Sequence, residues 1–177
     1  MKHVTCSIKK GFTLVELLVV SGIILLMSAI IFPNYRAGGE ALALQRSAHK
    51  LSQDLRRAEE LALSAKAYPN APTSFKGGYG VNFQINSTSY TLFADLNDNK
   101  IFDPSSVPPE ELEISNLEKK VKISGLSASP LNVVFLPPDP QFFVSGNFPA
   151  QINLFLETNP QKTKIIKVNQ AGLIAIQ

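Results

Sequence analysis

Glu16 is the residue whose position most needs a chemical explanation. It is the only charged residue in the apolar run over residues 12–32, and no lysine or arginine in that run can pair with it. A lone acid in a membrane segment costs about 2.5–3.5 kcal/mol near the helix centre, and less towards an end. The pattern favours a functional carboxylate, although a hydrated or protonated carboxylate at the membrane interface stays open.

A second group of oxygen side chains lies in the middle of the chain. It occupies positions 1, 3, 5 and 9 of a loop formed by Asp95, Asn97, Asn99 and Asp103. This spacing is similar to the start of an EF-hand-type calcium loop. Lys100 stands at the usual glycine position and Ser106 replaces the bidentate glutamate, for which Glu110 or Glu111 substitutes only if the loop folds back. Calcium binding and an Asx-rich hairpin turn capped by its own side chains both remain open.

Other catalytic chemistry has little support in the sequence. The chain has one cysteine, Cys6, and two histidines, of which only His49 follows the apolar run. His-based triads and multi-histidine metal sites are therefore excluded after that run. Glu110, Glu111 and Glu113 are interpreted as a solvated loop. We expect a protein that is not an enzyme and needs no cofactor, calcium apart.

The apolar run has the length of a membrane span. Its 21 residues, 12–32, reach about 31 Å as a helix, close to the roughly 30 Å hydrocarbon core of a bilayer. Lys2, Lys9 and Lys10 precede it, which favours a cytoplasmic N-terminus and places the rest of the chain outside the cytoplasm. The run is longer than a secretory signal core, and a plain signal anchor leaves Glu16 unexplained.

The residues at the start of the run resemble a type IV prepilin signal. Lys9-Lys10-Gly11-Phe12-Thr13-Leu14-Val15-Glu16 combines basic residues, a glycine, an aromatic residue and a glutamate in the order of that family's processing site. The resemblance implies that prepilin peptidase cuts between Gly11 and Phe12 and N-methylates Phe12. It also implies that Glu16 meets the new Phe12 amine of a neighbouring subunit and sets register during assembly.

That cut would change the chemistry of the chain. Three of the 17 basic residues lie before it, so 14 basic and 14 acidic residues remain, and the only cysteine is lost. A side-chain net charge of zero does not support a general nucleic-acid-binding surface.

The helical pattern continues beyond the span. Pro33 is expected to kink the helix, and Gly38-Gly39 is a second weak point. Apolar residues then recur three and four apart from about Glu40 to Ala67. We therefore predict a cleaved leader over residues 1–11, a span over 12–32, and the second half of a stalk helix over 33–67.

From Phe75 onward the apolar period changes to two. Seven strands are predicted: Tyr79–Ile85, Ser89–Ala94, Val121–Ile123, Asn132–Leu136, Ile152–Glu157, Lys164–Val168 and Leu173–Ile176. Turn residues separate them, including Asn159-Pro160. The fold class is α+β and pilin-like: a long N-terminal transmembrane helix packed on a β-rich head over residues 68–177.

The order of these elements is similar to that of the GspH/FimT-type minor pseudopilins. The similar stretches are residues 51–58, 90–103 and 133–137. DNA-uptake members of that group carry basic residues in the C-terminal tail, whereas residues 172–177 contain none. Lys162, Lys164 and Lys167 are interpreted as a solvated face, so a nucleic-acid partner is not expected.

We therefore expect a structural pilin or pseudopilin subunit of a type IV pilus or type II secretion system, which supports pilus biogenesis or protein secretion. It would be a single-pass inner-membrane protein with an external head, later part of a filament. The implied partners are prepilin peptidase, other pilins, an inner-membrane assembly platform and its ATPase. A tip-located pilin that binds a substrate, a surface or DNA is the alternative.

Overall fold

A computed structural model describes residues 11–64, 66–68, 71, 73, 75–137 and 141–177. Side chains are described for all of these except residues 32–37. The leader before Gly11 lies outside the described residues, as do parts of the predicted turns near residues 69–72 and 137–140. The chain forms two compact units that divide between Gly39 and Glu40.

One helix, α1 (Leu14–Leu63), runs through both predicted helical segments without a break between them. The backbone stays helical at Pro33 and at Gly38-Gly39, so the predicted interruption does not break the helix. The bend expected at Pro33 stays a prediction.

The helix ends four residues earlier than expected, at Leu63 rather than Ala67. Ser64 N still donates to Glu60 O at 2.9 Å, but Lys66 N donates to Leu61 O at 3.3 Å, which breaks the helical spacing of hydrogen bonds. Tyr79 Oη donates to Lys66 O at 2.7 Å. This hydrogen bond from β1 stabilises the segment at Lys66, where the chain leaves the helix.

The head has a five-stranded and a four-stranded antiparallel sheet. The first has the order β3-β2-β1-β5-β6 and the second the order β4-β7-β8-β9. The strands of the first are β1 (Tyr79–Phe83), β2 (Ser89–Ala94), β3 (Glu111–Asn116), β5 (Leu131–Leu136) and β6 (Gln141–Val144). Those of the second are β4 (Val121–Leu126), β7 (Ala150–Leu156), β8 (Asn159–Val168) and β9 (Ile174–Ile176).

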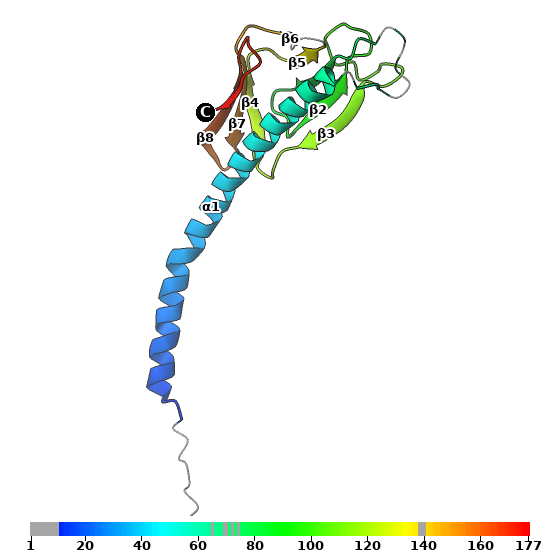
Figure 1. Cartoon of the computed structure of the whole chain (residues 1–177). Helices are drawn as coiled ribbons and strands as arrows, with labels where there is room; N and C mark the ends of the chain where they lie inside the picture. The colour runs from blue at the N-terminus through cyan, green and yellow to red at the C-terminus, as the bar shows by residue number, and fades with distance from the viewer. Residues whose placement is uncertain (1–10, 65, 69–70, 72, 74, 138–140) are drawn as a thin grey trace, which may run out of the picture. The chain divides into compact units, whose positions relative to one another are not determined.

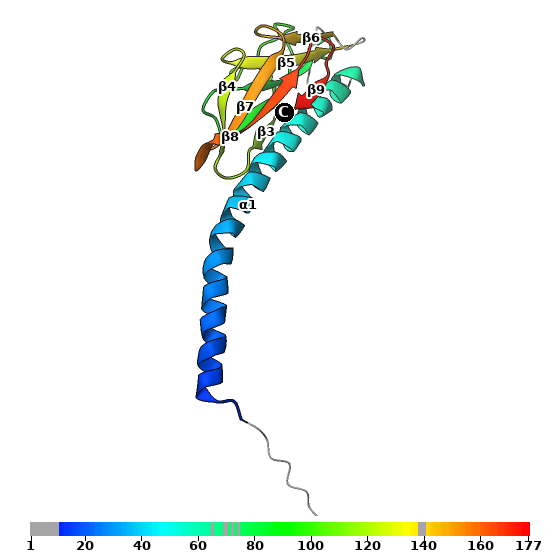
Figure 2. The same cartoon turned by 90° about the vertical axis from the view of Figure 1, so that its left-hand side faces the viewer.

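The part of α1 from Glu40 onward packs on these sheets (Figures 1 and 2). Its buried face follows the predicted three- and four-residue spacing, and Ala48, Leu51, Leu55 and Ala58 are fully buried. Alternate residues of β7 are buried as well, as expected for a strand with one face on a core. Small residues at Ala48 and Ala58 let the helix backbone approach the sheets closely.

Two strands were not predicted, and one predicted turn was wrong. β3 and β6 are edge strands, and β3 is largely exposed, so neither shows a clear apolar alternation. The solvated loop expected at Glu111 and Glu113 is strand instead. β8 begins at Asn159, where a turn was expected; Pro160 is tolerated because β9 pairs only with residues 166–168 and leaves the start of β8 at an edge.

A hydrogen-bonded carboxylate joins the helix to the first sheet. Tyr90 Oη on β2 donates to Asp54 Oδ2 at 2.6 Å, and Ser115 Oγ on β3 donates to the same oxygen at 2.9 Å. Burial, together with the hydrogen bond to Asp54, raises the pKa of Tyr90 well above its usual value. Asp54 therefore fixes the position of α1 against two neighbouring strands.

Removing the Tyr90 hydroxyl should weaken this junction. Tyr90→Phe keeps the buried ring but removes a hydrogen bond to a charged group, so we expect a loss of about 1.5 kcal/mol in the free energy of unfolding. Urea unfolding of residues 40–177, which have their own core, measures this loss. Ser105→Ala removes an exposed hydroxyl and is the control. Equal stability of Tyr90→Phe and the unmodified head would contradict the assigned role of Asp54.

Candidate functional site

The chain becomes helical directly after the predicted processing position. Gly11, Phe12 and Thr13 precede α1, and the Phe12 side chain is 79% exposed. Thr13 Oγ1 accepts a hydrogen bond from Glu16 N at 3.2 Å, and Thr13 O accepts one from Leu17 N at 3.2 Å. Thr13 is thus the N-cap of α1. This role was not predicted, although the Thr-x-x-Glu spacing signals it in the sequence.

Glu16 lies in the first turn of α1 and is exposed. A carboxylate in this position interacts favourably with the positive end of the helix dipole. Glu16 therefore lies at the N-terminal end of the apolar segment, four residues after Phe12, and not at the centre of the segment. This arrangement lowers the cost of keeping an acid in the segment.

The segment after Glu16 presents an apolar surface. Leu14–Ile31 has a mean hydropathy of 2.7, and none of this window is buried. Its hydroxyl groups are satisfied locally, since Ser21 Oγ donates to Leu18 O at 3.0 Å and Ser28 Oγ donates to Ile24 O at 2.7 Å. By length and composition this helix can cross a membrane.

In the head, the Asp/Asn loop folds around its own side chains. Asp95 is buried and accepts hydrogen bonds from Asn99 N at 3.1 Å and Lys100 N at 2.9 Å. Asp103 Oδ2 accepts from Asn97 Nδ2 at 2.9 Å and from Asn99 Nδ2 at 2.7 Å. These contacts form the network of an Asx-rich turn.

The four loop residues named as calcium ligands are thus brought together, but through contacts with one another. The Asn97 and Asn99 amide groups face Asp103 with their nitrogen atoms, whereas calcium requires oxygen ligands. Among the described residues, no cluster of three or more histidine, cysteine, aspartate or glutamate side chains has the geometry of a metal site. Calcium binding stays a prediction.

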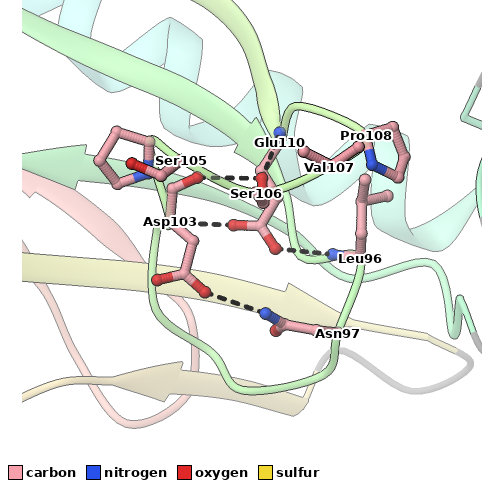
Figure 3. Close-up of a pocket in the computed structure, with 9 residues that line it drawn as sticks. Leu96, Asn97, Asp103, Ser105, Ser106, Val107, Pro108 and Glu110 are labelled. Atoms are coloured by element: carbon pink, nitrogen blue, oxygen red, sulfur yellow. Dashed lines mark hydrogen bonds between the residues drawn. The ribbon is translucent and has the colours of Figure 1, made fainter.

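Glu110 binds the backbone of this loop. The prediction that it belongs to a solvated acidic cluster was wrong. Its side chain is fully buried, with Oε1 accepting from Leu96 N at 3.3 Å and Oε2 accepting from Asp103 N at 2.9 Å (Figure 3). Nothing in the sequence signalled this burial, because both donors are backbone groups that only loop closure brings to Glu110. The loop does fold back, which a calcium ligand at Glu110 would require. The Glu110 carboxylate, however, accepts hydrogen bonds from the backbone of Leu96 and Asp103.

A pocket of about 650 Å³ opens beside this network. Its lining includes Leu96, Asn97, Asp103, Glu110 and the segment 104–108 (Figure 3). Burial raises the pKa of Glu110 and also that of Asp95, although their backbone donors oppose the shift. The carboxylates of this loop are structural anchors, since backbone and side-chain amides occupy them.

The exposed apolar helix and the antiparallel head with a helix packed on it define the class of protein. The predicted α+β pilin-like fold is confirmed. Residues 6–32 match the family model of the prokaryotic N-terminal methylation motif. The match supports a type IV pilin-like subunit that is anchored in a membrane, processed by a prepilin peptidase and assembled with other pilins. No curated protein and no solved structure matches the chain.

The raised pKa of Glu110 predicts a pH dependence of head stability. A carboxyl group with a folded-state pKa above the ordinary 4.5 binds more protons in the folded state, so its contribution is largest below 4.5 and is lost as pH rises through the raised value. Glu110→Gln cannot titrate. We therefore expect the unmodified head to gain stability relative to Glu110→Gln as pH falls from neutral towards 4.5. Urea unfolding of both proteins across this range tests the sign; a constant difference would show that burial does not shift Glu110.

Proposed function

We propose that this chain is a minor pilin or pseudopilin, cut after Gly11, N-methylated at Phe12 and assembled into a type IV pilus or a type II secretion pseudopilus. The observation that carries the proposal is the methylation motif over residues 6–32, of which Leu14–Ile31 lies on a helix with an unburied apolar surface. That surface needs lipid before assembly and apolar neighbours afterwards, and a filament core of such helices provides them.

Cleavage and Glu16 act together in this proposal. Hydrolysis of the Gly11–Phe12 bond leaves a carboxylate on Gly11 and a new amine on Phe12. The apolar segment has no basic side chain of its own, so this amine on a neighbouring subunit is a cation that Glu16 can reach. Pairing of the two charges in a low-dielectric filament core favours one register over others.

The head supports a finer assignment to the GspH/FimT-type subgroup. Its order of helix, strand pair, Asp-rich loop and final hairpin agrees with the order on which that resemblance rests. The subunit would then support secretion or pilus biogenesis, with force supplied by the assembly platform and its ATPase. A tip-located binding pilin differs from a shaft subunit in copy number, so its amount in sheared filaments distinguishes the two.

Processing gives a direct test of the proposed cut. We expect that co-expression with a prepilin peptidase yields a chain that begins at Phe12 and carries one added methyl group on its amine. Intact-mass and N-terminal peptide mass spectrometry measure both changes. Gly11→Leu should block the cut, because a bulky side chain replaces the smallest residue at the scissile bond, whereas Gly22→Leu is a matched control. Cleavage at another bond would overturn the assignment of Gly11.

Glu16 has a separate test. Glu16→Ala should insert into the membrane and be processed normally, but its yield in sheared filaments should fall at least about tenfold, as expected for the loss of a paired charge. Quantitative immunoblotting of membrane and filament fractions measures this ratio. Glu60→Ala, which removes an exposed acid in the head part of α1, is the control. Normal incorporation of Glu16→Ala would exclude the proposed charge pair.

A further inference from the structure

Lysines gather at the end of the head where the chain enters it, at Glu40. Glu40 Oε1 accepts from Lys120 Nζ at 2.8 Å, and Glu40 Oε2 accepts from Thr158 Oγ1 at 2.7 Å. Glu157 N donates to Lys120 O at 2.9 Å. The turn before β4 and the turn between β7 and β8 therefore meet at Glu40. We call this region the entry end: Glu40, Arg46 and residues 118–122 and 157–164.

The entry end carries excess positive charge. Its three acids are each paired: Glu40 with Lys120, Glu118 with Arg46, and Glu157 with Lys122. The hydrogen bond from Lys120 holds the pKa of Glu40 below its usual value, so Glu40 stays ionised. Six basic residues against three acids give a net charge of +3. Within the entry end, Lys119, Lys162 and Lys164 form no salt bridge with another described residue.

The opposite end of the head is acidic. Residues 95–113 contain six acids and one lysine, and with Lys76 and Arg57, which pair with Asp98 and Glu113, the net charge of this end is −3. Tyr68, which follows the C-terminal end of α1, donates from Oη to Pro109 O at 2.8 Å and so holds this segment there. The head therefore has a basic end and an acidic end, separated by the part of α1 between Glu40 and Leu63, which is about 35 Å long.

The chain itself ties the basic end to the apolar segment. Ile31 closes that segment, and Glu40 follows nine residues later. Nine residues span at most about 30 Å even when fully extended. Whatever the arrangement of the two units, Glu40, around which the entry end is built, stays within that reach of the end of the apolar segment. Where a membrane surface carries anionic phospholipid headgroups, these attract lysines within a Debye length of about 8–10 Å.

We propose that the entry end binds the anionic phospholipid headgroups next to the span and holds the head at the membrane surface until the subunit is extracted. Lys119, Lys162 and Lys164 make this contact, while the acidic end is repelled. The proposal rests on the membrane anchor of the proposed function but not on filament assembly.

The arrangement of the lysines favours a membrane over a nucleic acid. Lys162 and Lys164 share the face of β8 that carries buried Ile166, whereas Lys167 lies on the other face. The three lysines of β8 therefore do not form one continuous stripe along the strand for an extended polyanion. The positive charge instead gathers at one end, near the anchored part of the chain.

The test places a fluorophore at the entry end of the full-length chain. Gln161→Cys in a Cys6→Ser background provides one labelling site, and single copies are inserted into nanodiscs that contain lipids with nitroxide-labelled headgroups. Discs of phosphatidylcholine alone are compared with discs that also contain phosphatidylglycerol. We expect strong quenching only with phosphatidylglycerol, and a decrease as salt is added. A label at Ser105→Cys, in the acidic end, should show no such increase.

Removing the three lysines completes the test. Each lysine near an anionic surface changes binding roughly fivefold, so we expect Lys119→Gln/Lys162→Gln/Lys164→Gln to lower the docked-to-free ratio at least about tenfold. The matched variant Lys66→Gln/Lys100→Gln/Lys167→Gln has the same net charge and should behave as the unmodified chain.

Co-elution of every variant with the discs shows that the span has inserted, which separates a failed anchor from a failed head contact. Equal quenching in both lipid compositions, or undiminished quenching in the first triple variant, would overturn the proposal. Quenching that is absent in single-copy discs while heads associate at high concentration would assign the basic end to a second copy instead.

Discussion

The exposed apolar surface of Leu14–Ile31 is the constraint on which the rest of the molecule depends. The helix satisfies its own backbone hydrogen bonds, but Leu14, Leu26 and Ile30 remain 80%, 70% and 71% exposed. Burying one such side chain contributes about 1.5–3 kcal/mol, so a segment of this length is not stable as a free helix in water. Lipid and the apolar helices of other subunits are the two environments that solve this problem, and a pilin-like subunit uses them in succession.

The head must therefore fold without help from that segment. Its sheets and the later part of α1 form their own core, and two of its carboxylates accept hydrogen bonds from within the head. Glu110 receives two backbone donors, while Asp54 receives the Tyr90 and Ser115 hydroxyl groups. In the described part of the chain, neither carboxylate forms a salt bridge. The head thus stays intact when the environment of the apolar segment changes from lipid to protein.

Much of this could be predicted from the sequence because it follows from local patterns. The buried face of α1 obeys its three- and four-residue spacing, and β2 has the predicted bounds Ser89–Ala94. β3 was missed because Glu111 and Glu113 resemble a solvated loop, and the Arg57 that pairs with Glu113 is 56 residues away in the chain. The burial of Glu110 has the same cause: its donors come from a loop whose closure no local pattern encodes.

The net charge of the sequence likewise does not reveal how folding distributes charge over the head. A processed chain with 14 basic and 14 acidic residues has no side-chain charge in sum, yet folding separates a +3 entry end from an acidic segment at the other end of the head. Lys119 and Lys162 are 43 residues apart in sequence, and only the pairing of β4, β7 and β8 unites them with Glu40. A neutral composition therefore excludes a uniformly basic surface, but it does not exclude a head with one basic end and one acidic end. Such a head has a preferred orientation beside any charged surface, and in the proposed docking the span that precedes Glu40 keeps the basic end near the membrane until the subunit is extracted.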